Sequence, residues 1–185
     1  MPDLGDKKKS NNVAYIDGAN LHKGIGQLGW ELDYRKFRVW LAEKHAVRTA
    51  YLFLGLIPRY SALYTSLQEA GYVLIFKETV CDGDGKPKGN CDADLVLRTV
   101  VDVYEGDFDA AILVTSDGDY AGLVKFLQEK GKIRAVLSPS IAMKCSILLK
   151  RTDVKITYLD QMRHLLCVQK EKAPGEDGTS QGSLS

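Results

Sequence analysis

The sequence predicts an α/β fold: a single Rossmann-like domain of three layers, in which helices flank a mainly parallel central sheet. Strand-like runs alternate along the chain with helix-like runs, which predicts right-handed crossovers between parallel strands. Most strand-like runs are continuous stretches of β-branched, aliphatic and aromatic residues, as expected of strands covered on both faces. The chain has 185 residues, 45% hydrophobic and 26% charged, which suits one domain with its own core.

The first half of the chain is expected to contain three strands with two helices between them. The strands are the apolar runs VAYID, VRTAYLFL and YVLIF. Asp33 suits the N-cap of the first helix, and Gly71 suits the residue that follows the second. In chain order we expect a strand at 13–17, a helix at 33–45, a strand at 47–54, a helix at 59–70 and a strand at 72–76.

The second half is expected to continue the alternation with the strands AAILVTS, IRAVL and VKITY. Asp92 suits an N-cap at the start of this half, and Asp119 suits the N-cap of a later helix, which Gly131 would follow. In chain order we expect a helix at 92–104, a strand at 110–116, a helix at 119–130, a strand at 133–137, a helix at 140–150, a strand at 154–158 and a helix at 160–168.

Four segments are predicted to lie outside this pattern. We expect a flexible N-terminal arm at 1–12, one domain at 13–168 and a disordered tail, rich in Gly, Ser and acidic residues, at 169–185. Residues 77–91 carry several turn signals and predict a loop or small hairpin over the edge where the strands end. The string GIGQLG at 24–29 matches a dinucleotide-binding pattern, but it does not follow the first strand directly, and we interpret it as a loop.

Composition narrows the class of protein. The net charge of +1 gives no overall basic field for nucleic acid, so such binding would need local patches. No apolar run approaches the roughly 18 residues of a membrane span, and we expect no membrane association. The four cysteines form no CxxC pair and predict neither a disulfide framework nor a zinc site. Scattered thiols suit a reducing cytoplasm.

Aspartates stand at the ends of two predicted strands. Asp17 ends the run VAYID, and Asp117 follows the run AAILVTS. In parallel α/β sheets ligands bind beyond the carboxyl ends of the strands, and both aspartates fall on that edge. At about 4 Å and an effective dielectric constant near 20, each pair of like charges would cost roughly 4 kcal/mol. Such a group needs protons, a lysine or a divalent cation. Because no lysine stands beside these motifs in the sequence, we expect a cation.

Three further polar residues are candidate site residues. Asp94 lies in the first turn of the central predicted helix, Asp119 lies two positions beyond the second strand-end aspartate, and Asn20 lies three positions beyond Asp17. Each has a structural alternative. Asp94 could pair with Arg98, and Asp119 could cap a helix. Asp17 and Asn20 could form an Asx turn or a helix cap without any chemistry.

Three motifs together resemble the NYN family of PIN-like nucleases: YIDGANL, CDADLVLRTVVD and ILVTSDGDYAGLVKFLQEKGK. The resemblance covers roughly residues 12–160 and rests on the ordered set of motifs rather than on any one of them. It implies a compact Rossmann-like, PIN-like fold with an acidic pocket. It also implies that the family's first-strand aspartate and asparagine are Asp17 and Asn20, its central-helix aspartate is Asp94 with Asp92 as a rival, and its acidic pair is Asp117 and Asp119.

The resemblance predicts a metal-dependent endoribonuclease that hydrolyses RNA phosphodiester bonds with Mg²⁺ or Mn²⁺. The expected metal ligands are the four aspartates Asp17, Asp94, Asp117 and Asp119, and Asn20 joins them as a catalytic residue. The expected partner is RNA, single-stranded or structured with exposed loops, and a homodimer stays open. The alternative is a non-catalytic RNA- or protein-binding module on the same fold. A phosphatase of the haloacid dehalogenase type is disfavoured, because Ala19 stands where its second aspartate would be.

Overall fold

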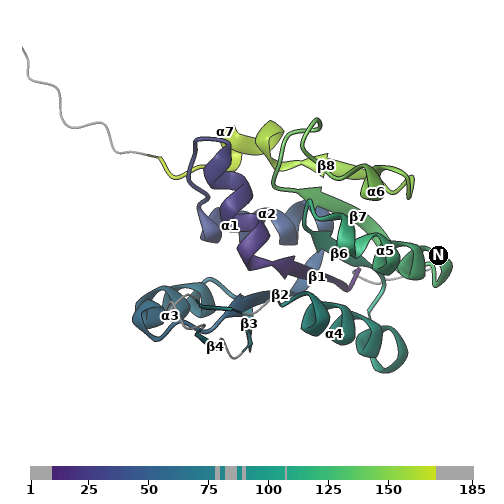
Figure 1. The fold of residues 1–185 in the computed structure, drawn as a ribbon, viewed down its shortest axis with the longest axis horizontal. Coiled ribbons are helices and arrows are strands. Elements are labelled where there is room, and N and C mark those ends of the chain that lie inside the picture. The colour runs from purple at the N-terminus through teal and green to yellow at the C-terminus, as the bar shows by residue number, and fades with distance from the viewer. Residues whose placement is uncertain (1–9, 78–79, 82–86, 89–90, 107, 170–185) are drawn as a thin grey trace, which may run out of the picture.

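The computed structural model describes residues 10–77, 80–81, 87–88, 91–106 and 108–169, and it has the predicted α/β fold (Figure 1). Its centre is a six-stranded sheet in the order β3-β2-β1-β6-β7-β8, and every neighbouring pair is parallel. The strands are β1 (Asn12–Asp17), β2 (Val47–Gly55), β3 (Val73–Lys77), β6 (Ala111–Val114), β7 (Ile133–Ser138) and β8 (Ile156–Tyr158). The bounds of all six lie within two residues of the predicted bounds.

Helices cover both faces of the sheet and complete the three layers. One face carries α1 (Gly18–Gln27), α2 (Tyr34–His45), α3 (Ser61–Glu69) and α7 (Arg163–Leu166), whose buried side chains share one core cluster. The other face carries α4 (Asp92–Glu105), α5 (Ala121–Glu129) and α6 (Ile147–Lys150), packed around a second cluster. Short 3₁₀ turns at Pro58–Tyr60, Gly118–Tyr120 and Leu159–Met162 lead into α3, α5 and α7. Among the residues described, no helix is long and apolar enough to cross a membrane.

The side chains of β1 alternate between the two cores. Ala14 and Ile16 belong to the cluster under α1, whereas Val13 and Tyr15 belong to the cluster under α4. The same alternation directs Asp17, the last residue of the strand, to the side of α4.

The strand order reverses at the centre of the sheet. From β1 the chain moves outward to β2 and β3, then α4 carries it back across to β6, which pairs with the other side of β1. This reversal leaves a topological switch point between the carboxyl ends of β1 and β6, the place where open α/β sheets bind their ligands. The two strand-end aspartates stand on either side of it.

The stretch after Asp17 differs from its prediction. We expected no helix between residues 18 and 32, but residues 18–27 form α1, which contains two glycines of the GIGQLG string. Two glycines of α1 allow close packing: a Cβ at Gly24 would lie 2.5 Å from the carbonyl oxygen of Pro139, and one at Gly18, before the string, would lie 2.6 Å from that of Phe53. The low helix propensity that glycine gives the stretch is therefore offset by tertiary contact.

The predicted helix at 140–150 is mostly wrong. Only α6, residues 147–150, is helical, and residues 139–146 form turns and bends. The side chain of Ser138 contacts Ser140, and the hydroxyl of Ser146 accepts a hydrogen bond from the backbone N–H of Leu148. Serine hydroxyls that bond the nearby backbone compete with a continuous helix, and here they do so on both sides of the turn.

The predicted caps are partly confirmed. Asp33 caps α2 through the N–H of Lys36, and Gly71 and Gly131 follow their helices with φ of +93° and +63°. Asp119 is not a cap; Asp117 fills that role for the 3₁₀ turn before α5. Asp92 is the first residue of α4, after an N-cap at Cys91 that makes no side-chain bond.

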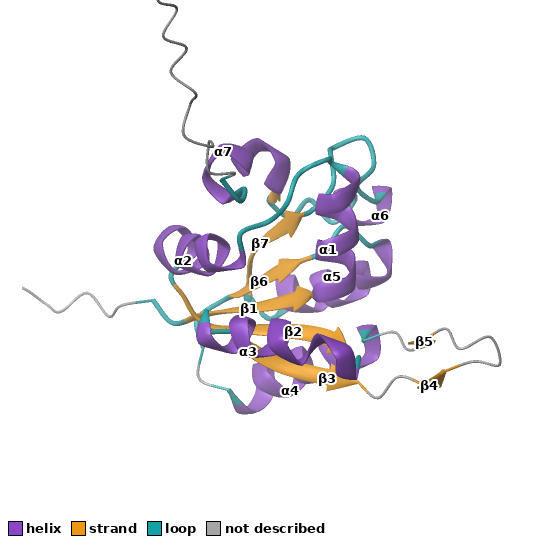
Figure 2. Cartoon of the chain, turned by 90° about the vertical axis from the view of Figure 1, so that its left-hand side faces the viewer, coloured by secondary structure: helices purple, strands orange, loops and turns teal. Residues whose placement is uncertain are grey.

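A small hairpin lies within the connection at 77–91. β4 (Val80–Cys81) and β5 (Pro87–Lys88) pair antiparallel, and Figure 2 draws them beyond the carboxyl ends of β2 and β3. This agrees with the predicted hairpin over that edge. Residues 1–9 of the predicted arm and 170–185 of the predicted tail lie outside the described residues.

Candidate metal centre

Three aspartates form a cluster of carboxylates at the switch point. Asp92 begins α4, whereas Asp117 and Asp119 follow β6 at the start of a 3₁₀ turn. One carboxylate oxygen of each lies within 4.8 Å of an oxygen from each of the others. Asp92 and Asp117 are half-buried and Asp119 is exposed, so the cluster opens to solvent on one side.

Asp17 lies beside this cluster and is only 6% exposed. Its Oδ1 accepts a hydrogen bond from the backbone N–H of Asn20 at 3.0 Å, which caps α1. Burial raises the pKa of its carboxyl above the ordinary value, and the negative charges of Asp92 and Asp117 raise it further, against the hydrogen bonds that lower it. The helix cap that the sequence left as an alternative is thus present, and the negative charges of the cluster also act on this carboxylate.

Tyr120 joins Asp17 to Asp92. Its hydroxyl contacts Asp92 Oδ1 at 2.5 Å and Asp17 Oδ2 at 3.3 Å, and the residue is buried. Burial and the two carboxylates raise the pKa of this phenol, which stays a neutral donor. From the sequence alone, Tyr120 could stack on a base or belong to the core, and nothing assigns it to the site. No local pattern could have found its role, because the two carboxylates come from other elements.

The side chain of Asn20 contacts the segment that carries Asp117. Its side-chain oxygen accepts hydrogen bonds from the backbone N–H of Ser116 at 2.9 Å and from the Ser116 hydroxyl at 3.0 Å. The Asp117 side chain in turn accepts from the N–H of Asp119 at 3.1 Å. Asn20 thus ties α1 to the segment after β6, and the Asp117 bond fixes the turn that carries Asp119.

Asp94 is not one of the three clustered aspartates. Its side chain is 45% exposed, although its Oδ2 atom is buried and accepts no hydrogen bond. Its Oδ2 lies 3.6 Å from Nζ of Lys77, at the end of β3, which is an ion pair beyond hydrogen-bond distance. The alternative Asp94–Arg98 pair does not form, because Arg98 binds Asp102 and the Tyr51 hydroxyl. Of the two aspartates that the sequence left as rivals, the structure brings Asp92 to the cluster. It also brings a lysine to this edge that is distant in sequence.

The carboxylates of the cluster repel one another when they are ionised. At 4.8 Å and an effective dielectric constant near 20, each pair would cost about 3 kcal/mol. The separation also suits an ion, because oxygens on opposite sides of Mg²⁺ lie about 4.2 Å apart at a metal–oxygen distance near 2.1 Å. The residues present therefore fit a divalent cation.

The donor atoms at the cluster indicate which class of cation it would bind. Cys91 precedes Asp92 directly and is half-buried. Burial, followed by the charges of Asp17 and Asp94, raises the pKa of its thiol to about 11. The three clustered donors are all carboxylates, and Cys91 is not among them. An oxygen-only donor set favours hard cations such as Mg²⁺ and Mn²⁺.

Comparisons with known proteins give the family and the fold. A family model described as "NYN domain" matches residues 12–159. The fold is similar to the crystal structure of a protein of unknown function from Vibrio parahaemolyticus, with a TM-score of 0.71 and 21% sequence identity, over 88% of this chain and 99% of that chain. At that identity the likeness shows the fold alone. No curated protein matches the chain.

Proposed function

The chain belongs to the NYN domain family of PIN-like nucleases, and from this premise we propose that it is a metal-dependent endoribonuclease. The observation that carries the proposal is the carboxylate cluster of Asp92, Asp117 and Asp119 at the switch point of the sheet. Nuclease sites need oxygen ligands close enough to share a cation, on an edge that a nucleic-acid strand can reach. This cluster meets both requirements.

In this proposal Asp92, Asp117 and Asp119 would hold Mg²⁺ or Mn²⁺, and Asp17 is the fourth carboxylate, behind Asp92. The bound cation would supply positive charge to polarise a phosphodiester and to activate water. Without it, the carboxylates would repel the phosphates of any nucleic acid. Activity is therefore expected to depend strictly on the cation.

The chain's own residues hold the carboxylates in place. Tyr120 fixes Asp92 relative to Asp17, and Asn20 fixes the segment after β6 through Ser116. The backbone N–H of Asp119 fixes the Asp117 carboxylate. Because these bonds exist before any ligand binds, little conformational freedom is lost on binding, and the site is preorganised. We assign Asn20 a positioning role, in place of contact with substrate.

The proposed substrate is RNA, single-stranded or with exposed loops. A single strand can bend so that its backbone enters the carboxylate edge, which a stiff duplex does less easily. The net charge of +1 supplies no long-range attraction, so recognition must depend on local contacts around the site.

Cleavage of a labelled single-stranded RNA tests the proposal. We expect cleavage with Mn²⁺, none with EDTA, and a loss of at least about 100-fold in Asp92→Asn and in Asp117→Asn, because each removes charge from the proposed ligands. Asp94→Asn is the matched control: it lies two positions along the same helix, outside the cluster, and is expected to retain most of the activity.

Two results would contradict the assignment. Full activity of Asp117→Asn would show that the cluster does not support the chemistry. Tight RNA binding that survives EDTA, with no cleavage under any metal, would favour the non-catalytic binding module. Thermal unfolding of each variant should accompany the assay, so that a folding defect is not mistaken for a chemical one.

A further inference from the structure

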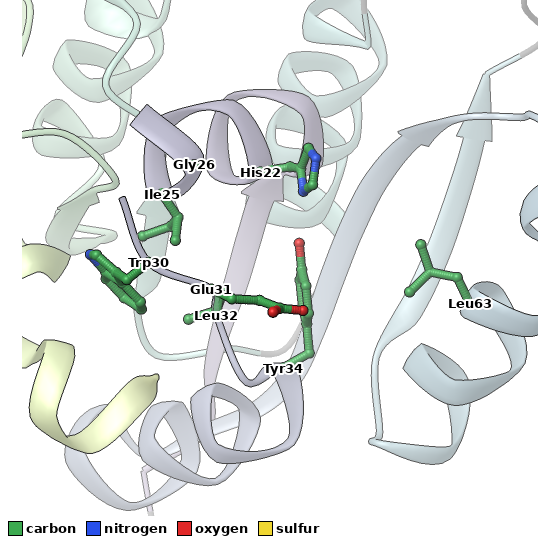
Figure 3. A pocket seen from close by; sticks show the side chains of 8 residues that line it. All are labelled: His22, Ile25, Gly26, Trp30, Glu31, Leu32, Tyr34 and Leu63. Atoms are coloured by element: carbon green, nitrogen blue, oxygen red, sulfur yellow. The ribbon is translucent and has the colours of Figure 1, made fainter. Parts of the chain in front are cut away.

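A half-open cavity of about 250 Å³ lies on the other face of the sheet, along the helix that Asp17 caps. Its walls come from α1, from the loop before α2 and the first residue of α2, and from the first turn of α3 (Figure 3). The carboxylate cluster uses none of these lining residues. The cavity is therefore a separate feature that shares only α1 with the candidate metal centre.

The cavity has fixed aromatic and aliphatic walls. The Trp30 indole is held in place because its N–H donates to Asp160 at 3.1 Å, and the Tyr34 ring packs edge-on against Tyr72 with ring centroids 6.2 Å apart. Leu63 stands across from them in Figure 3 and is 48% exposed. Rigid, flat walls of this kind suit a planar ring better than a flexible chain.

Three polar groups enter the cavity without partners among the residues that the structure describes. They are the half-buried Tyr34 hydroxyl and the exposed His22 imidazole and Glu31 carboxylate, and none makes a hydrogen bond or an ion pair there. Figure 3 shows the Tyr34 hydroxyl pointing toward His22. Burial raises the pKa of Tyr34 to about 12, so its hydroxyl keeps its proton at neutral pH. The cavity thus combines apolar walls with unused donors and acceptors, as small-molecule sites do.

We propose that this cavity binds one base of the RNA strand that is cleaved at the carboxylate cluster, with guanine preferred. The proposal rests on the proposed function and extends it to a substrate contact. A volume of about 250 Å³ falls just below the roughly 300–1,000 Å³ of sites for drug-sized ligands, which suits a single base. Bases of single-stranded RNA are recognised by stacking on aromatic side chains and by hydrogen bonds to their Watson–Crick edges.

Glu31 carries the preference for guanine. An ionised carboxylate only accepts hydrogen bonds. Guanine is the one common base whose Watson–Crick edge places two N–H donors side by side, on N1 and N2, so both carboxylate oxygens can be used. Uracil offers one N–H donor on that edge, and adenine and cytosine offer one amino group beside an acceptor that would face the negative charge.

The position of the cavity suits a strand that also reaches the cluster. His22 lies five residues beyond the cap Asp17, or about 7.5 Å along the axis of α1. That length corresponds to about two steps of a nucleic-acid strand at 3.4 Å each. The path to the cluster also crosses from the α1 face to the α4 face, so the bound base would lie at least two nucleotides from the scissile bond.

Tryptophan fluorescence tests the proposal directly. The chain has two tryptophans, so Trp40→Phe leaves Trp30, which lines the cavity, as the only reporter. In this background, titration with guanosine in EDTA should give saturable quenching, at least about tenfold tighter than with uridine. Glu31→Gln should weaken guanosine binding about tenfold, as expected for losing a charge-assisted hydrogen bond. Glu129→Gln, an exposed change on α5, is the matched control and should leave binding unchanged.

The absence of saturable quenching by guanosine would overturn the proposal, and so would equal guanosine affinity of Glu31→Gln and its parent. The titration uses neither metal nor a phosphodiester, so it is independent of cleavage. Failure to bind guanosine in a protein that cleaves RNA rejects the cavity alone. Conversely, guanosine binding in a protein that cleaves no RNA rejects the nuclease function and, with it, the RNA strand as the source of the base.

Discussion

Tyr120 lies between two carboxylates and has one hydroxyl proton to share between them. A phenol donates one hydrogen bond. The contact with Asp92 is 2.5 Å and that with Asp17 is 3.3 Å, so the proton is directed at Asp92. Asp17 Oδ2 therefore receives a weaker interaction while it remains buried. The residue orders the carboxylates without occupying a ligand position itself.

Tyr120→Phe keeps the ring in the core and removes only the hydroxyl. We expect the affinity for Mn²⁺ to fall about 10- to 100-fold, as for other groups that orient metal ligands, with the fold retained. Isothermal titration with Mn²⁺ measures this. Tyr15→Phe is the control, because it removes a buried hydroxyl from the same core cluster, bonded to Asp102 away from the carboxylate cluster. Unchanged Mn²⁺ affinity in Tyr120→Phe would show that the hydroxyl does not order the site.

Sequence could place Asp17 and Asp117 at one edge because strand ends are readable from apolar runs. It could not choose between Asp92 and Asp94. Side chains two positions apart on a helix point in directions that differ by about 200°. Which of the two aspartates faces the cluster therefore depends on how α4 is rotated against the sheet. Packing against the sheet sets that rotation and buries Leu95 completely. The rotation cannot be predicted from the sequence without the surface on which the helix packs.

At the scale of elements, α1 is a helix that the helix propensities of its residues do not predict. Its glycines lower the intrinsic preference for a helix, and from the sequence alone they indicate a loop. In the structure Gly24 lies against Pro139, whereas Gly26 has open space around the position of its Cβ. Of these two glycines, only Gly24 is required by close packing, and alanine substitutions can test the difference.

Gly24→Ala and Gly26→Ala are expected to change stability in opposite directions. At Gly24 the new Cβ would meet the Pro139 backbone at 2.5 Å, and overpacking of this kind costs about 1–3 kcal/mol. At Gly26 the Cβ meets nothing within 4 Å, and alanine should stabilise the helix by about 0.5–1 kcal/mol. Urea unfolding measures both. Equal effects of the two changes would contradict the packing role of Gly24.

At the scale of the whole molecule, the net charge of +1 conceals a strongly uneven distribution. Asp17, Asp92, Asp117 and Asp119 gather at one edge of the sheet. The alternation of elements predicts parallel strands, but it does not say on which side of β1 each later strand is added. The site exists because α4 returns the chain to the free side of β1. That step depends on the packing of the whole domain, which no local motif records.

The repulsion within this edge makes stability depend on the cation. A ligand that binds only the folded state, at a concentration 100 times its dissociation constant, adds about 2.7 kcal/mol to the free energy of unfolding. For a chain of this size that should raise Tm by roughly 5–10 °C. We expect Mn²⁺ to give this shift in calorimetry and EDTA to remove it. Asp117→Asn should abolish the shift and should itself unfold at a higher temperature than the metal-free parent, because it removes a repelling charge. Asp94→Asn should keep the shift. If the shift survived in Asp117→Asn but vanished in Asp94→Asn, the cation would bind at Asp94 and the assignment of the cluster would be wrong.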